Sequence, residues 1–138
     1  MLGSGGARGL AHVGVIRWLE ENGHEIRSIS GCSIGSLIGG AYAAGKLDAV
    51  VEWMESFTKK EIYSMIDLSF TWNSLVKGDK MMAAIQSKIG TDLIEDLPIK
   101  FTAVAADIAA EKEHWFQSGP IDQAIRASVS LPLFFTPY

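Results

Sequence analysis

Gly31, Ser33 and Gly35 form the pattern G-x-S-x-G within the stretch GCSIGS. This pattern is typical of serine hydrolases whose nucleophile lies on a sharp turn between a strand and a helix. Glycine on either side of the serine keeps side chains away from the neighbouring backbone in such a turn. The free amides and partial positive charge at a helix start favour a developing oxyanion. Ser33 is therefore the candidate nucleophile, and the alternative is that its hydroxyl caps the start of the helix.

A second glycine-rich stretch, GSGGARG, runs from Gly3 to Gly9 and opens the first predicted helix. Its backbone amides could bind an anion. A dinucleotide fingerprint fits poorly because Arg8 takes the place of the third glycine, and a Walker loop is excluded because no Gly-Lys-Ser/Thr follows. We therefore interpret the stretch as an oxyanion hole with the amides of Gly5 and Gly6 as donors. Arg8 either anchors the loop or meets a lipid phosphate, with a solvated helix charge as the alternative.

The elements that must position these two stretches alternate between helix and strand. Helices are predicted at 7–23, 33–45, 47–68, 78–90 and 120–130, and strands at 25–32, 99–108 and 113–119. Gly23, Gly45 and Gly90 are the predicted helix stops. Asp79 is predicted to cap the fourth helix, and Pro120 to lie in the first turn of the last one. This order predicts an α/β fold, a three-layer sandwich with a mostly parallel central sheet.

Composition narrows the class of protein. The 138 residues suffice for a single domain, and the net charge of −4 argues against a nucleic-acid partner. Cys32 is the only cysteine, which excludes an internal disulfide and suits a reducing cytosol. No H-E-x-x-H or C-x-x-C motif is present, so neither a metal nor a cofactor is expected. Residues 28–45 are uncharged but half serine and glycine, which predicts a strand, turn and helix rather than a membrane span.

The two ends are predicted to be truncated. Only Met1 and Leu2 precede the glycine stretch, although such a loop normally follows a strand. The chain stops on the apolar segment SLPLFFTPY without a closing element. Within it, LPLFF at residues 131–135 either lines an acyl-chain groove or touches a membrane, and a core or cap segment is the preferred interpretation.

The two glycine stretches together resemble the patatin-like phospholipase family, most closely its small bacterial members related to the neuropathy target esterase group. Gly5, Gly6, Arg8 and Gly9 match the family's G-G-G-x-[RK]-G pattern, and Ser4 replaces its first glycine. Later segments, FTAVAADIAAEKEHWF and AIRASVSLPLFFTPY, are similar to the family's second half. The resemblance therefore covers nearly the whole chain, as a single patatin-like domain over residues 1–138.

The resemblance implies a fold and an activity. The fold is the patatin-like sandwich, and the activity is hydrolysis of lipid acyl esters, of phospholipase or lysophospholipase type, by a Ser–Asp dyad with Ser33 as nucleophile. No cofactor and no nucleic acid are implied. The expected partner is a lipid or other acyl ester, with peripheral membrane contact. The expected location is the cytoplasm, at the inner face of a membrane.

The catalytic base is the missing part. The family places its aspartate in an Asp-Gly-Gly or Asp-Gly-Ala motif after a Ser-x-Pro segment, and this sequence has no Asp-Gly pair. The base is therefore expected after residue 138, and these residues alone are expected to be inactive. Asp107, at the end of a predicted strand, is the tempting substitute, but a turn-stabilising role is preferred.

One rival mechanism is disfavoured, and two alternatives stay open. A Ser-His-Asp hydrolase would use Ser33, Asp107 and His114, although the last two are close in sequence and few strands precede the serine. An acyltransferase would normally carry histidine before the serine, where Cys32 stands. A catalytically silent lipid-binding or regulatory protein would keep the fold alone. His12, on the first helix, is predicted to pack or cap rather than to catalyse.

Overall fold

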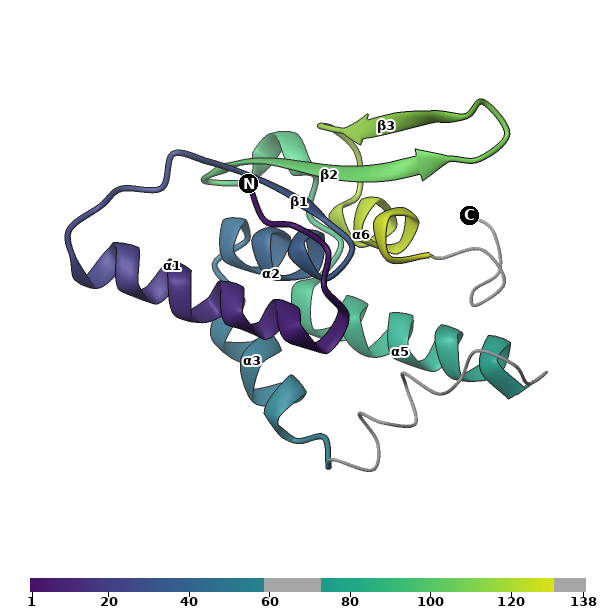
Figure 1. The fold of residues 1–138 in the computed structure, drawn as a ribbon, viewed down its shortest axis with the longest axis horizontal. Helices are drawn as coiled ribbons and strands as arrows, with labels where there is room; N and C mark the ends of the chain where they lie inside the picture. The colour runs from purple at the N-terminus through teal and green to yellow at the C-terminus, as the bar shows by residue number, and fades with distance from the viewer. Residues whose placement is uncertain (59–72, 131–138) are drawn as a thin grey trace.

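The structure is a computed structural model that describes residues 1–58 and 73–130, without the side chains of 73–80 (Figure 1). Within these ranges, three α-helices lie between the first and second strands, and the second and third strands follow one another directly. The elements in chain order are η1 (Gly6–Leu10), α1 (Ala11–Glu21), β1 (Ser28–Cys32), α2 (Ile34–Ala43), α3 (Leu47–Glu55), α5 (Asn73–Ile89), η3 (Ile94–Asp96), β2 (Lys100–Asp107), β3 (Lys112–Phe116) and α6 (Ile121–Val129).

The sheet has the order β1-β2-β3. β1 and β2 are parallel, with Cys32 opposite Val104, and β3 returns antiparallel to β2. Leu2 adds a further parallel bridge to Gly31 on the other side of β1. Parallel strands need a crossover connection that is usually helical, and the connection from β1 to β2 runs through α2, α3 and α5. The predicted α/β class is confirmed.

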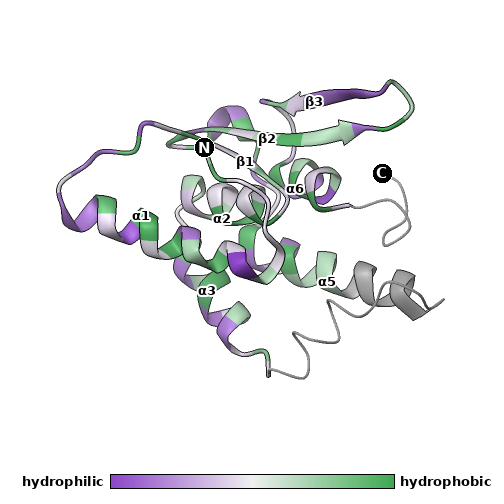
Figure 2. Cartoon of the chain, in the orientation of Figure 1, coloured by the Kyte–Doolittle hydropathy of each residue, from purple (hydrophilic) through white to green (hydrophobic). Residues whose placement is uncertain are grey.

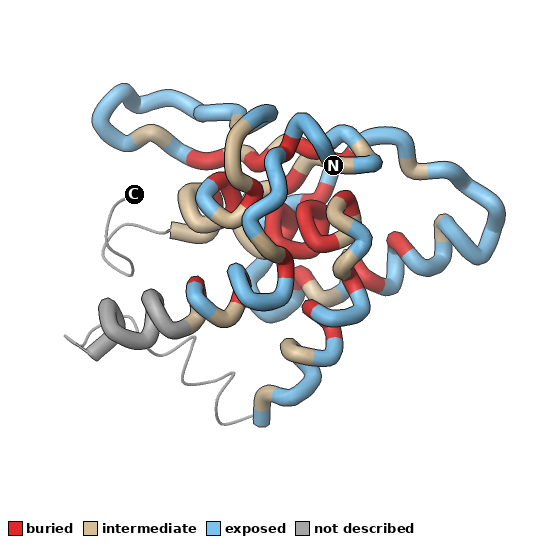
Figure 3. The backbone as a smooth tube through the Cα atoms, turned by 180° about the vertical axis from the view of Figure 1, so that it is seen from behind, coloured by how far each residue is buried: buried red, intermediate tan, exposed pale blue. Residues whose placement is uncertain are grey.

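One face of the sheet is covered by helices. Phe101 and Ala103 on this face are buried against α2 and α6, whereas Thr102 and Val104 on the opposite face are half-buried. These elements supply the sheet and one helical layer of the predicted sandwich. Figure 3 shows the buried residues gathered around α2 and the sheet, with exposed residues along β3 and the turn that precedes it.

α2 is the central helix and can be central because its residues are small. A Cβ at Gly40 would come within 2.8 Å of Ile125 on α6 and 3.2 Å of Phe101 on β2. Its other neighbours, α1 and α3, add buried side chains such as Ile16 and Val50. The hydrophilic residues lie at the periphery, along β3 and in the connection from α1 to β1 (Figure 2).

The predicted helix stops agree with the structure. Gly23, Gly45 and Gly90 follow α1, α2 and α5 and have φ values of 75°, 68° and 84°. Such left-handed backbone is favourable for glycine at a helix end. Residues 28–45 fold as β1 and α2, as predicted, and no helix in the two described ranges combines the length and apolar character needed to cross a bilayer.

The predicted helix starts were less accurate. The prediction that Asp79 caps the fourth helix is wrong, because α5 begins at Asn73 and runs through that position. Pro120 is the N-cap of α6 rather than a first-turn residue. The amphipathic segment 47–68 forms α3 in its first half, while residues 59–72 and the segment 131–135 lie outside the described residues.

Candidate active site

Ser33 lies at the junction between β1 and α2, in the segment 31–35 that we call the elbow. Its backbone has φ 56° and ψ −123°, a combination outside the regions that L-amino acids normally occupy. Such conformations persist only where the surrounding structure enforces them, and they cluster at functional sites. The strand–turn–helix arrangement that the sequence predicts is therefore present around Ser33.

The two glycines of the elbow are required by close backbone contacts. A Cβ at Gly31 would overlap the carbonyl of Gly35, and a Cβ at Gly35 would overlap the carbonyls of Leu2 and Gly3. These neighbours are backbone atoms, so no side-chain rotation could relieve the overlap. The chain turns from β1 into α2 within one residue because both positions lack a side chain.

The Ser33 hydroxyl does not cap the helix that follows it. Ser33 is the N-cap residue of α2, but its side chain makes no capping hydrogen bond. Instead, the Ser36 hydroxyl donates to the Ser33 carbonyl oxygen at 2.7 Å. The half-buried Ser33 Oγ has no hydrogen-bond partner among the described residues. The capping alternative therefore loses its support.

The glycine loop, residues 3–9, starts beside the elbow. The Leu2 amide donates to the Ser30 carbonyl at 2.7 Å, and the Cys32 amide donates to the Leu2 carbonyl at 3.1 Å. Leu2 therefore lies alongside β1 as a short parallel strand, and the loop begins where β1 ends. Ligands of open α/β sheets bind at this carboxyl edge.

The loop also returns to the elbow at its far end. Gly9 is buried, and a Cβ there would overlap the side chain of Ile34, the residue after Ser33. Between these ends, Gly5 is the N-cap of η1, and Gly6 opens η1 with φ 52°. Neither amide donates to another described residue. Within the described residues, both amides are therefore without an acceptor, as an oxyanion donor would be before substrate binds.

His12 on α1 contacts the same loop. Its Nε2 lies 2.9 Å from the Gly3 carbonyl oxygen. Because a carbonyl oxygen only accepts, Nε2 carries a proton and donates it. The role of His12 is thus that of a tether for the loop, which agrees with the predicted packing or capping role. Arg8, in contrast, is exposed on η1.

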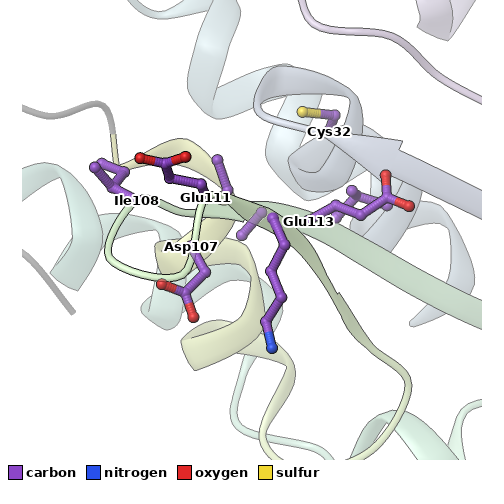
Figure 4. A pocket seen from close by; sticks show the side chains of 9 residues that line it. Cys32, Asp107, Ile108, Glu111 and Glu113 are labelled. Atoms are coloured by element: carbon purple, nitrogen blue, oxygen red, sulfur yellow. The ribbon is translucent and has the colours of Figure 1, made fainter.

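An open cavity of about 560 Å³ adjoins the elbow (Figure 4). Cys32 of β1 lines it together with residues 104–108 of β2 and the following turn, and 111–113 at the start of β3. Val104 and Ile108 give it apolar walls, and the carboxylates of Glu111 and Glu113 lie at its margin. Cys32 is the residue before Ser33, and it is the part of the elbow that contributes to the lining of this cavity.

A family model described as "Patatin-like phospholipase" matches residues 1–138. The chain belongs to the patatin-like phospholipase family. An uncharacterized NTE family protein of Mycobacterium tuberculosis is 45% identical over 137 residues, and "Lysophospholipase nte1" of Emericella nidulans is 36% identical over 144 residues. "Neuropathy target esterase sws" of Drosophila grimshawi is 31% identical over 142 residues. The resemblance expected from the two glycine stretches is confirmed.

The match covers 99% of this chain but only part of each relative. It spans 38% of the mycobacterial protein, 9% of the Emericella protein and 10% of the Drosophila protein. The matched segment is thus accompanied by further sequence in those proteins. The match does not by itself show that this chain has the activity of the longer proteins, so that activity can only be proposed for it.

Asp107 hydrogen-bonds within the turn that follows β2. Its Oδ1 accepts a hydrogen bond from the Ala110 amide at 3.0 Å, across the turn between β2 and β3. Asp side chains commonly stabilise turns in this way. No hydrogen bond joins Asp107 to Ser33 within the described residues. The preferred prediction for Asp107, a turn-stabilising role, agrees with this contact.

The rival triad is not assembled. Asp107 pairs with Lys112 across the hairpin, whereas His114 pairs with Ala105. The His114 ring lies against Phe116, with ring centroids 4.4 Å apart. Among the described residues, no hydrogen bond links His114 to Asp107 or to Ser33. The geometry needed by a Ser-His-Asp hydrolase is therefore missing from this part of the chain.

Ser128 on α6 is a site residue that the sequence motifs do not predict. The Ser33 amide donates to Ser128 Oγ at 2.8 Å, although the two residues are 95 positions apart. Ser128 lies on the buried stripe of α6 that contains Ile121, Ala124 and Ile125. The helical spacing of that stripe was a usable signal, because a hydroxyl on an apolar face must find a partner.

Proposed function

We propose that this protein is a serine acyl-ester hydrolase of lipids, of phospholipase or lysophospholipase type, with Ser33 as its nucleophile. The observation that carries the proposal is the strained, positive-φ backbone of Ser33 beside a glycine loop with unpaired amides. Membership of the patatin-like phospholipase family and a relative named as a lysophospholipase support the same substrate class.

The proposed reaction follows from the arrangement of the elbow and the loop. Ser33 Oγ attacks the ester carbonyl carbon and loses its proton to a base. The amides of Gly5 and Gly6 stabilise the oxyanion of the tetrahedral intermediate, aided by the N-terminus of α2. The alcohol of the ester leaves with a proton, and water then hydrolyses the acyl-enzyme.

We assign the base to an aspartate outside residues 1–138, as the family's Ser–Asp dyad implies. A carboxylate serves as a general base when it lies within hydrogen-bond reach of the hydroxyl. We expect residues 1–138 alone to lack turnover for this reason.

The cavity next to the elbow fits the acyl part of such a substrate. Val104 and Ile108 supply apolar walls, and Ile108 is 63% exposed at the turn between β2 and β3. Trp115 on β3, 58% exposed, lies on the same hairpin. Tryptophan and aliphatic side chains are favourable at a lipid interface. We therefore propose peripheral contact with the cytoplasmic face of a membrane through this hairpin.

The proposal is tested with the full-length protein and lysophosphatidylcholine. We expect wild-type protein to release free fatty acid and Ser33→Ala to release none. Ser87→Ala is the matched control, because the Ser87 hydroxyl bonds only to the Ala84 carbonyl of its own exposed helix turn. Equal fatty-acid release by Ser33→Ala would contradict the proposal.

The same assay separates the remaining alternatives. An acyltransferase would consume the lysophospholipid but deliver the acyl group to an added acceptor, such as a second lysolipid or a carrier thiol, rather than to water. A silent lipid-binding protein would bind vesicles of the lipid without releasing any product.

A further inference from the structure

Ser128 is an unusual residue for its position. It is 8% exposed, and among the described side chains only Ser36 and Ser128 are both polar and buried. Buried hydroxyl groups need hydrogen-bond partners, because an unpaired one is costly. The partners of Ser128 lie on two other elements, at the end of β1 and in β2.

Both hydrogen bonds of Ser128 have a fixed direction. Ser128 Oγ lies 2.6 Å from the carbonyl oxygen of Val104, which can only accept, so the hydroxyl donates there. The Ser33 amide donates to the same oxygen atom at 2.8 Å. The hydroxyl therefore forms a bridge from the backbone N–H of Ser33 to the backbone C=O of Val104.

The Ser128 bridge lies where the backbone hydrogen bonding between β1 and β2 ends. Successive backbone N–H groups of a strand point to opposite neighbours, and the Cys32 amide donates to Leu2 on one side, so the Ser33 amide faces β2 on the other. The register pairs Cys32 with Val104, and its continuation would bring the Ser33 amide to the Val104 carbonyl. The elbow bends away at Ser33, and the Ser128 hydroxyl spans the gap that results.

We propose that Ser128 is a positioning residue that holds Ser33 in its reactive backbone conformation. This inference rests on the proposed function of Ser33. Without the hydroxyl, the half-buried amide of Ser33 and the half-buried carbonyl of Val104 would lose their shared partner. The chain at Ser33 would then relax from φ 56° and carry the hydroxyl away from the glycine loop. Small displacements of a reacting group cost large factors in rate.

Three variants of the full-length protein test the kinetic effect. We expect Ser128→Ala to lower kcat about 10- to 100-fold with KM within about twofold, because the substrate contacts are unchanged. Ser128→Thr keeps the hydroxyl and restores most of kcat. Ser130→Ala is the matched control, since its hydroxyl donates to the Arg126 carbonyl of the same helix at 2.6 Å, and its kcat stays within about twofold.

Ser128→Cys covers the case in which the alanine variant fails to fold. The thiol preserves the volume but is a weak hydrogen-bond donor and acceptor, so we expect the same loss of kcat. An unchanged kcat in Ser128→Ala or Ser128→Cys would overturn the positioning role. An equally low kcat in folded Ser128→Thr and Ser128→Ala would also overturn it.

Amide hydrogen exchange tests the bridge independently of activity. We expect the Ser33 amide to be protected in wild type and in Ser130→Ala, and to exchange at least about tenfold faster in Ser128→Ala. An unprotected wild-type Ser33 amide would overturn the bridge even if the protein proved to be an esterase. A protected Ser33 amide in a protein without esterase activity would instead overturn the proposed function and leave the bridge standing.

Discussion

Two turns at the carboxyl edge of the sheet contain a non-glycine residue with positive φ, Ser33 after β1 with 56° and Glu111 between β2 and β3 with 50°. At the elbow, Gly31 and Gly35 allow neighbouring backbone to pack closely. The hydroxyls of Ser36 and Ser128 also form hydrogen bonds with the backbone of Ser33. The hairpin turn is exposed, and the Asp107 bond to the Ala110 amide supports it. A strained residue therefore indicates a functional site only where its surroundings hold it in place.

The largest expected effect is at the elbow itself, in Gly35→Ala. The added methyl group would overlap the Leu2 and Gly3 carbonyls, so the elbow and the glycine loop must separate. We expect the free energy of unfolding to fall by about 3 kcal/mol, and reaction of Ser33 with a fluorophosphonate to be lost. Urea unfolding and labelling rates measure both quantities.

Gly14→Ala is the control for this prediction. Gly14 lies on α1 with nothing within 4 Å of the added Cβ, so the change should stabilise the helix by about 0.5–1 kcal/mol. Normal labelling and normal stability of Gly35→Ala would show that the elbow tolerates a side chain, and would contradict the claim that close backbone contacts hold it in place.

A smaller effect is expected where the glycine loop meets the elbow, in Gly9→Ala. The methyl group would overlap the Ile34 side chain near its Cβ, and these are side-chain atoms that a second substitution can remove, unlike a backbone carbonyl. We expect a loss of about 1–3 kcal/mol and slower labelling of Ser33. In the double variant Gly9→Ala, Ile34→Ala the overlap is removed, so labelling should recover relative to Gly9→Ala. No recovery would mean that the loop depends on something other than this contact.

At the turn between β2 and β3, we expect a substitution to change the stability of the protein without changing the reactivity of Ser33. Asp107→Ala removes the acceptor for the Ala110 amide and should lower stability by about 1 kcal/mol, while Ser33 labelling stays within about twofold. Asp107→Asn retains a side-chain oxygen at this position and should match wild type in both measurements. Abolished labelling in either variant would make Asp107 part of the catalytic machinery.

The smallest effect concerns Tyr42, whose hydroxyl donates to Glu20 Oε1 at 2.9 Å between α2 and α1. Partial burial, followed by the Glu20 hydrogen bond and charge, raises the pKa of Tyr42 above its ordinary value. The pKa of Tyr42 is higher in the folded protein than in the unfolded chain. The stability gained from its hydrogen bond to Glu20 is therefore complete below the pKa of the unfolded chain, and it is lost as pH rises through the pKa of the folded protein.

Tyr42→Phe should therefore be less stable than wild type at pH 7, by about 0.5 kcal/mol because the pair is largely exposed. The difference should shrink as the solution becomes strongly alkaline. Urea unfolding of both proteins over a pH series measures it, and a difference that grows with pH would contradict the assignment.

Local patterns predicted the parts of the fold that depend on local chemistry. Gly23, Gly45 and Gly90 mark helix ends because glycine adopts positive φ readily, and the order of strands and helices follows from side-chain periodicity. The start of α5 was misplaced because a Gly-Asp pair at residues 78 and 79 is typical of a helix cap. A glycine inside a helix costs only about 1 kcal/mol, and α5 runs through both positions.

The site could be predicted in part for the same reason. Gly31, Gly35 and Gly9 are conspicuous in the sequence, and their meaning follows from the need for close approach. The helical spacing of α6 marks Ser128 as a hydroxyl on an apolar face, but it does not identify the partner, because the Ser33 amide is 95 positions away and is reached only when α6 packs beside β2. Tertiary contacts of this kind leave little trace in local patterns.

The central claim is that the half-buried hydroxyl of Ser33 is the reactive group of this protein. Its most direct test is to label the full-length protein with a fluorophosphonate and to map the modified peptide by mass spectrometry. The account predicts one adduct, on Ser33, that disappears in Ser33→Ala. An adduct on another residue, or undiminished labelling of Ser33→Ala, would contradict it.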